Sequence, residues 1–166
     1  MNGKGVTVAM DLSTPAAPVD STLLIPRSHT VHMVRITAPD LRQAQKQSAR
    51  IRAQFDDSDD RVAVLLDVIA HIAPEAHTAR TEARWQPAAI DTTTGDTVLY
   101  IGTPRGLAGL ILDIYAAGVA DGVTVVPAVA EGDARDTCVQ LLGDEVRTIL
   151  ATHSARSDVP IRRRAG

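Results

Sequence analysis

Two ionisable residues lie in or beside the most apolar stretch of the chain. Asp67 interrupts an aliphatic run, and His71 follows that run. A carboxylate in such a run is either paired within the core or directed at a cavity, because burying it unpaired is costly. A histidine just past a strand end can polarise a reactive intermediate, and the alternative is a histidine exposed to solvent. His71 is therefore a weak catalytic candidate.

Other residue types that often carry chemistry occur here in unfavourable patterns. His29 and His32 are three residues apart, but such positions of an extended segment face opposite sides, so the spacing does not favour a shared metal. No phosphate-binding loop or nucleophile-elbow motif is present. The single cysteine, Cys138, excludes an internal disulfide and falls on the apolar side of a predicted helix. The sequence predicts no metal site.

The elements that must position these side chains alternate between strand and helix. Apolar runs predict strands at 31–36, 61–72 and 123–126, and apolar periodicity predicts helices at 39–55, 74–85 and 104–117. The last of these helices has Thr103 as its N-cap, Pro104 at its first position and Gly118 just past its end. A further amphipathic helix begins near Asp133. Alternation over about 30 residues indicates βαβ units and a parallel sheet. The predicted class is α/β, without a hairpin.

The composition narrows the class of protein further. Aromatic residues make up only 2% of the chain, so the core must be aliphatic. The net charge of −3 gives no basic surface for nucleic acid, and the basic run at 162–164 predicts a solvated tail. No apolar run approaches the roughly 18 residues of a membrane span, and residues 1–20 lack a signal segment. We therefore expect a cytoplasmic protein.

Two stretches carry motifs in a specific order. The first is Ile101-Gly102-Thr103-Pro104, then an amphipathic helix, then Ala117-Gly118-Val119-Ala120-Asp121-Gly122-Val123 and Pro127. The second is Pro26-Arg27-Ser28, followed by Val34 to Leu41 and by Val64 to Val68. Together they resemble the C-terminal part of the bacterial-luciferase-like, flavin-dependent monooxygenases. The resemblance covers about residues 20 to 150.

The resemblance implies a (β/α)8 barrel that binds FMN or a deazaflavin. Such enzymes oxidise small organic molecules with oxygen and a reduced flavin that a partner reductase supplies. Arg27 and Ser28 match the Pro-Arg-Ser motif, and an arginine fork there would contact a phosphate, the alternative being a loop residue in solvent. Functional groups in barrels gather at the C-terminal ends of strands, which points to Thr37 and to His71, near a flavin or an oxygen intermediate.

A complete barrel takes about 250 residues, so the resemblance implies an incomplete copy. The expected fold is a partial TIM-barrel-like parallel sheet with flanking helices. Its expected organisation is an irregular segment at 1–30, an incomplete luciferase-like domain at 31–151 and a flexible basic tail at 152–166. Two functions stay open: a flavin-dependent monooxygenase, or a non-catalytic remnant that acts as a dimerisation or partner module. Open sheet edges predict a homo-oligomer or a covering partner chain.

Overall fold

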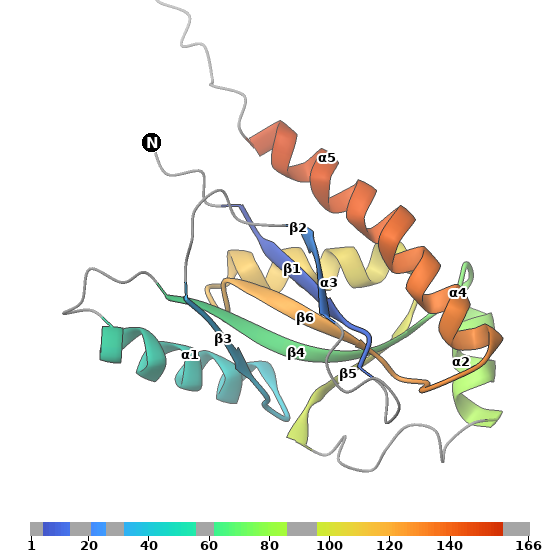
Figure 1. The fold of residues 1–166 in the computed structure, drawn as a ribbon, viewed down its shortest axis with the longest axis horizontal. Coiled ribbons are helices and arrows are strands. Elements are labelled where there is room, and N and C mark those ends of the chain that lie inside the picture. Colours follow the sequence, from blue (N-terminus) through green and yellow to red (C-terminus); the bar gives the residue numbers. More distant parts are fainter. Residues whose placement is uncertain (1–4, 14–20, 26–31, 56–61, 86–95, 158–166) are drawn as a thin grey trace, which may run out of the picture.

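A computed structural model describes residues 5–13, 21–25, 32–55, 62–85 and 96–157 of the 166-residue chain. Within them, strands and helices alternate after an N-terminal pair of strands (Figure 1). The strands are β1 (Thr7–Asp11), β2 (Ser21–Ile25), β3 (His32–Ile36), β4 (Val62–Ile72), β5 (Val98–Gly102) and β6 (Gly122–Pro127). The helices are α1 (Leu41–Phe55), α2 (Ala76–Trp85), α3 (Pro104–Ala116), α4 (Asp133–Leu141), a π-helical turn η2 (Leu142–Val146) and α5 (Arg147–Ser157). None of these helices is long and apolar enough to cross a bilayer.

The six described strands form one sheet, in which five follow the order β2-β1-β6-β4-β3 and β5 pairs with β4 off this path. All neighbouring pairs are parallel except β1 with β2. The long strand β4 is the centre: β6 pairs with one of its edges, while β3 and β5 pair with successive halves of the other. The predicted α/β class, with a mainly parallel sheet and flanking helices, is therefore confirmed.

The pairing of β1 with β6 joins the first strand of the chain to the last. In a closed barrel the first strand also lies beside the last, as β1 lies beside β6 here. The order departs from that of a barrel at β5, which follows β4 in the chain but pairs with the edge of β4 that also carries β3, so that β4 and β6 are direct neighbours. The predicted resemblance began near residue 20 and left β1 out. The structure adds β1 to the barrel-like part of the chain.

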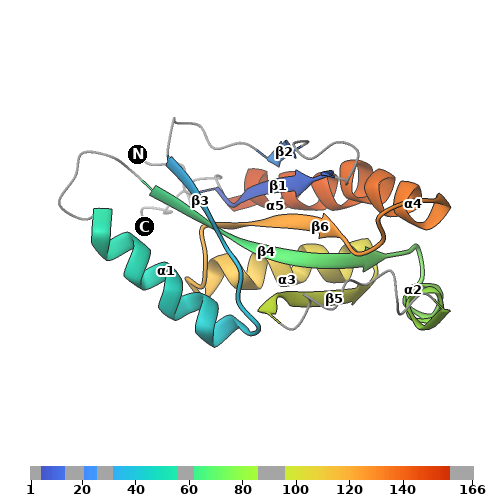
Figure 2. The same ribbon diagram turned by 60° about the horizontal axis from the view of Figure 1, so that its bottom comes forward.

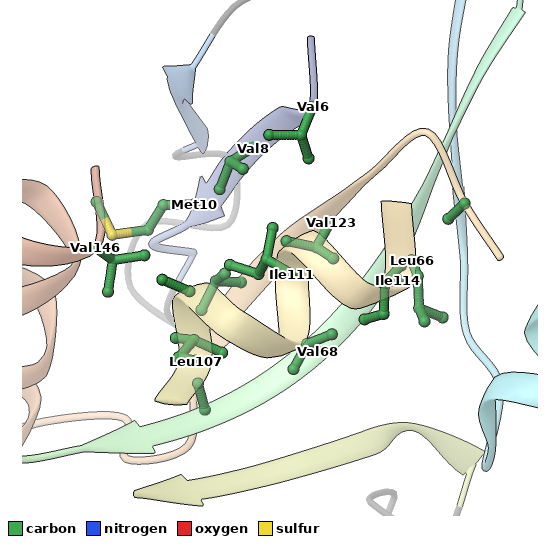
Figure 3. Close-up of a cluster of buried hydrophobic side chains, with 14 of the residues drawn as sticks. Val6, Val8, Met10, Leu66, Val68, Leu107, Ile111, Ile114, Val123 and Val146 are labelled. Atoms are coloured by element: carbon green, nitrogen blue, oxygen red, sulfur yellow. The ribbon is translucent and has the colours of Figure 1, made fainter. Parts of the chain in front are cut away.

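The apolar core lies on one face of the sheet. Alternate residues of β4, among them Leu66 and Val68, meet Val123 of β6 and Ile111 of α3 (Figure 3). Figure 2 shows α3 and α5 behind the strands, and α1 adds Ala44 to the same core. These side chains are almost all aliphatic, as the scarcity of aromatic residues predicts.

Helix α3 begins and ends as predicted. The Thr103 hydroxyl accepts a hydrogen bond from the Gly106 amide at 3.2 Å, and Pro104 occupies the first helical position, where an N–H would have no partner within the helix. Beyond the last turn, Gly118 has a φ of 66°, a conformation that favours glycine.

The π-helical turn η2 joins α4 to α5, and the spacing of the buried residues explains it. Cys138, Leu142, Val146 and Leu150 are all buried and are four residues apart. On a regular α-helix, four-residue steps drift by roughly 40° each. The π-helical turn η2 has more residues per turn, so it keeps the four side chains in one line against the sheet.

Three predictions about the chain ends and turns are wrong. Residues 7–11 and 21–25 form β1 and β2, so the segment 1–30 is not irregular throughout. The same two strands pair antiparallel, although no hairpin was expected. At the other end, α5 continues to Ser157, so the helix includes the start of the segment predicted to be a flexible tail from residue 152. Residues 158–166 lie outside the described part.

Candidate functional site

The face of the sheet opposite the apolar core carries polar side chains. Side chains alternate along a strand, so residues between core positions face the other way. Asp67 lies between Leu66 and Val68, and the registers align it with Thr124 of β6 and Ala9 of β1. We call this surface the polar face; its hydrophilic members include Thr7, Asp11, Arg35, Asp67 and Thr124.

Three charged residues of the polar face form one hydrogen-bonded group, which we call the arginine cluster: Asp11, Arg35 and Asp67. Arg35 donates from Nε and Nη2 to the two carboxylate oxygens of Asp67, at 3.0 and 2.9 Å. Its Nη1 donates to Asp11 at 2.6 Å. The Asp67 side chain is only 12% exposed, so this bidentate pair explains how a carboxylate fits within an aliphatic strand. Of the two predicted alternatives for Asp67, pairing is confirmed.

Contacts within the cluster shift the pKa values of Asp11 and Arg35. Burial works to raise the pKa of Asp11, but hydrogen bonds from Ser13 and the neighbouring Arg35 outweigh it, so the pKa of Asp11 is lowered. The hydrogen bonding of Arg35 to the Asp67 carboxylate, in which Arg35 donates, is the main cause that raises the pKa of Arg35, against its partial burial. With two carboxylates and one guanidinium, the cluster carries a formal charge of −1. It would favour cationic groups over anionic ones.

Two hydroxyl groups on the polar face have no hydrogen-bond partner among the described residues. The Oγ1 atoms of Thr7 and Thr124 are buried and unpaired, and both residues are only 1% exposed. A buried hydroxyl without a partner costs about 1–3 kcal/mol. Such groups need an ordered water or a ligand to satisfy them.

His71 is held at the carboxyl-terminal end of β4. It is 2% exposed, and its Nε2 lies 2.9 Å from an oxygen of Glu82 on α2. The alternative of a solvent-exposed His71 is therefore wrong. Its Nδ1 is buried without a partner, and a catalytic role for His71 stays a prediction. Cys138 is buried as predicted, and burial raises the pKa of its thiol, which makes it a poor nucleophile.

The remaining predicted site residues are not brought together by the described structure. Thr37 is exposed just after β3, and Arg27 and Ser28 lie outside the described residues. Within the described ranges, no group of three His, Cys, Asp or Glu side chains could hold a metal. Sequence reasoning missed Arg35 and Asp11 as site residues. The available signal was a charged residue between two apolar ones in each of two strands, Arg35 in β3 and Asp67 in β4.

The described residues of the polar face do not fit a flavin phosphate. Arg35 is the cation of the arginine cluster, and all three of its donors used there bind carboxylates. Asp11 and Asp67 would repel a phosphate brought beside them. Residues outside the described part, or a second chain, must supply the phosphate contact if this protein binds FMN.

The Ala-Gly-x-x-Asp-Gly motif lies at the opposite, amino-terminal end of the strands. The Asp121 carboxylate accepts the Val64 amide at 3.0 Å and an Arg52 Nη2 donor at 3.2 Å. The Asp121 backbone also donates to the Val64 carbonyl at 2.8 Å and accepts from the Thr7 amide at 3.2 Å. One residue thus joins β1, β4 and α1, which is a structural role.

Comparisons with known proteins agree with the fold. No family model matches the sequence, and no curated protein matches it. EDTA monooxygenase from Chelativorans sp. BNC1 superposes on 74% of this chain with a TM-score of 0.59 and 14% identity. Long-chain alkane monooxygenase (LadA) superposes on 82% with a TM-score of 0.56 and 13% identity. The riboflavin lyase RcaE, solved with modified FMN and riboflavin, superposes on 74% of this chain with a TM-score of 0.57 and 13% identity.

The chain covers 40%, 40% and 39% of those three proteins, respectively. Matches at this identity concern the fold alone. The resemblance that the sequence predicted is thus confirmed for the fold: the chain is similar in architecture to part of each of these three proteins.

Proposed function

We propose that this chain is one component of a flavin-dependent monooxygenase, and that a second chain completes its barrel. The complete assembly uses reduced FMN or a deazaflavin and oxygen to oxidise a small organic substrate. A partner reductase supplies the reduced flavin, and the assembly is cytoplasmic. The pairing of β1 with β6 carries the proposal, because it reproduces the seam at which a barrel closes.

The edges of the sheet support the proposed second chain. Strand β3 pairs only with β4 among the described strands, so its other edge has free backbone donors and acceptors. Met33 on β3 and Leu99 on β5 are 52% and 40% exposed, and both strands lie along the same edge of β4. Apolar side chains beside an unpaired strand favour coverage by another polypeptide. The occupant that we propose for this edge is a second copy of this chain.

The polar face is where such a component would meet a substrate. Asp67, Arg35 and the orphaned hydroxyl of Thr124 lie on the face that turns away from the helices. In barrels that face lines the interior, and its carboxyl-terminal end holds the reacting groups. The residues of this chain would orient a polar substrate there, while the flavin, when bound, supplies the oxidation chemistry.

The alternative is a non-catalytic module of the same ancestry. The engagement of Arg35 by two carboxylates favours it, since that leaves no cation of the arginine cluster for a phosphate. Such a module would dimerise or cover a partner through β3 and would bind no flavin.

Flavin titration combined with light scattering separates the two functions. Purified chain is titrated with FMN, riboflavin and the deazaflavin, and flavin fluorescence is followed, while the same sample is sized. The proposal predicts an oligomer that binds FMN with a Kd below roughly 100 μM, about −5.5 kcal/mol. If FMN binds at least about tenfold tighter than riboflavin, a phosphate site exists, and Arg27→Gln should abolish the difference.

A folded, monodisperse monomer that binds no flavin at roughly 1 mM would contradict the proposal. An oligomer without flavin binding would favour the partner module. Cooperative thermal unfolding of the same preparation serves as the control that the protein is folded.

A further inference from the structure

The buried histidine at the end of β4 has one ring nitrogen that the fold uses and one that it leaves without a contact. His71 is 2% exposed, and its Nε2 lies 2.9 Å from a carboxylate oxygen of Glu82. This contact fastens α2 to the carboxyl-terminal end of the strand, beside which the helix lies (Figures 1 and 2). The Nδ1 of His71 is buried and has no hydrogen-bond partner among the described residues. A structural role therefore explains Nε2 but does not explain Nδ1.

The contact with Glu82 determines which nitrogen carries the proton. A carboxylate only accepts hydrogen bonds, so the Nε2 of His71 is the N–H that donates to Glu82. In a neutral imidazole the other nitrogen is then an acceptor. Nδ1 therefore presents a lone pair that no described residue satisfies, and a buried polar atom without a partner costs stability. A donor from an ordered water or from a ligand must meet it.

Aliphatic side chains flank His71 on its own face of the sheet. Alternation along β4 places Ile69 on the same face as His71. The parallel register pairs Ile69 with Leu99 and His71 with Ile101, so these residues of β5 share that face. Ile69 and Ile101 are partly buried, and Leu99 is 40% exposed. A buried water needs about two to four polar partners, and these three side chains offer none. A ligand that is apolar apart from one donor group fits the surroundings better.

The position of His71 is also that of a reacting group in a barrel. Such groups lie at the carboxyl-terminal ends of the strands. The last strand, β6, ends at Pro127, which pairs with Ala70, so His71 extends past β6 while it still pairs with β5. The Glu82 side chain is 41% exposed, which places the His71–Glu82 pair directly beneath the surface.

We infer that the Nδ1 of His71 is the proton acceptor for a substrate of the phenol class, an apolar compound with one hydroxyl group, and that Glu82 is the positioning residue of His71. The inference rests on the proposed function and names a substrate class for the carboxyl-terminal end of the polar face. The hydroxyl donates to Nδ1 while the apolar ring packs against Ile69 and Ile101. In the transfer the O–H bond breaks, an N–H bond forms at Nδ1, and the electron pair stays on the oxygen. The Glu82 carboxylate balances the charge of the resulting imidazolium.

A phenol fits this site better than an aliphatic alcohol or an ion. A phenol has a pKa of about 10, far below that of an aliphatic alcohol, and its anion is more easily oxidised. A charged substrate would lose its hydration among Ile69, Leu99 and Ile101. Leu99 also lies on the edge that the proposed second copy covers, so association would shield this surface from water.

Binding of p-cresol and of p-methylanisole to the purified full chain, without flavin, tests the inference. The second compound keeps the apolar ring and lacks the hydroxyl group. Wild type is compared with His71→Gln, whose amide nitrogen can still donate to Glu82 but which offers no acceptor at the position of Nδ1. We expect wild type to bind p-cresol roughly tenfold more tightly than p-methylanisole. His71→Gln should bind the two compounds about equally.

Nitrogen NMR of the histidine rings tests the role of Glu82. The chain has five histidines, and His71→Gln identifies the signals of His71. In wild type we expect the proton on Nε2 and a shift of the Nδ1 signal when p-cresol binds. Glu82→Gln can donate as well as accept, so it should give a mixture of tautomers and weaken the preference for p-cresol roughly threefold or more. The matched control Glu75→Gln removes the same charge from an exposed residue just before α2 and should change neither readout.

Three results would overturn the inference. One is a proton on Nδ1 in wild type. Another is folded wild type that binds both compounds equally or binds neither. The third is a preference for p-cresol that survives in His71→Gln or, if that variant does not fold, one that Glu82→Gln leaves unchanged. Circular dichroism and thermal melting verify folding. Because these titrations contain no flavin, failure of the flavin titration above contradicts the proposed function separately from the binding at His71.

Discussion

The two ends of the parallel sheet are built in different ways. At the amino-terminal end, Asp121 and Gly122 join the start of β6 to β4 and β1, largely through backbone hydrogen bonds. At the carboxyl-terminal side, ionisable side chains contact one another: Arg35 binds Asp67 and Asp11, and His71 contacts Glu82. The first end fixes strand positions. The second presents ionisable groups, some of them partly exposed.

This difference distinguishes residues that maintain the fold from residues that could take part in a reaction. In barrels the amino-terminal end contributes stability and the carboxyl-terminal end contributes function. The Ala-Gly-x-x-Asp-Gly motif is the most specific part of the predicted resemblance, and Asp121 shows that its role here is structural. A motif at that end predicts a shared fold and cannot predict a shared reaction.

The largest effect on the amino-terminal end should come from Gly122→Ala. A Cβ at Gly122 would overlap the carbonyl oxygen of Thr7, which is backbone and cannot move aside without parting β1 from β6. We expect a loss of about 3 kcal/mol or more in the free energy of unfolding, measured in urea. The matched control is Gly109→Ala on α3, where an added Cβ meets no atom within 4 Å. It should gain about 0.5–1 kcal/mol.

The same substitution at both ends tests the comparison directly. Asp67→Asn replaces one acceptor of the bidentate pair with an amide that faces the Arg35 donors, so we expect a loss of about 2 kcal/mol, reduced by the partial exposure of Arg35. Asp121→Asn keeps an oxygen that can accept the Val64 amide and weakens the Arg52 contact. Its expected cost is about 0.5–1 kcal/mol. Equal losses in the free energy of unfolding for the two variants, measured in urea, would contradict the distinction between the two ends.

Much of the fold could be predicted because its signals are local. The nearly continuous aliphatic run of β4 is typical of a strand covered on both faces. Thr103, Pro104 and Gly118 mark the ends of α3 by their own conformational preferences. Strand β1 was not predicted. It has only five residues between glycines and prolines, and its partner β6 begins over a hundred residues later. Its strand identity depends on that partner.

The arginine cluster could not be predicted for a related reason. Whether Arg35 meets Asp67 depends on the register that pairs Arg35 with Leu65 and Asp67 with Thr124. A shift of one residue would turn either side chain to the other face. The contact of His71 with Glu82 likewise depends on the direction in which α2 leaves β4. A sequence shows a charged residue in a strand, but only the packed sheet shows its counter-ion.

Thr124→Val should increase stability, which sharpens the description of the polar face. The buried hydroxyl of Thr124 has no partner, so its replacement by a methyl group should gain about 1 kcal/mol in thermal or urea unfolding. The control is Thr103→Val, whose hydroxyl caps α3, and it should lose about 1 kcal/mol. Destabilisation by Thr124→Val would indicate instead that the hydroxyl holds an ordered water or a ligand.

The smallest effect should be an acid-dependent one at Asp11. Its folded-state pKa is lowered below the ordinary value of 3.8, so the unfolded chain binds the proton more readily than the folded one. The contribution of Asp11 to stability is therefore complete above that ordinary value and is lost as the pH falls through the folded-state pKa. Because the partner Arg35 is 42% exposed, the contribution should be below about 1 kcal/mol. Asp11→Asn should lower the free energy of unfolding at pH 7 by this amount and flatten its decline in acid. An unchanged acid profile in the variant would show that the carboxyl-terminal end owes its acid sensitivity to other groups.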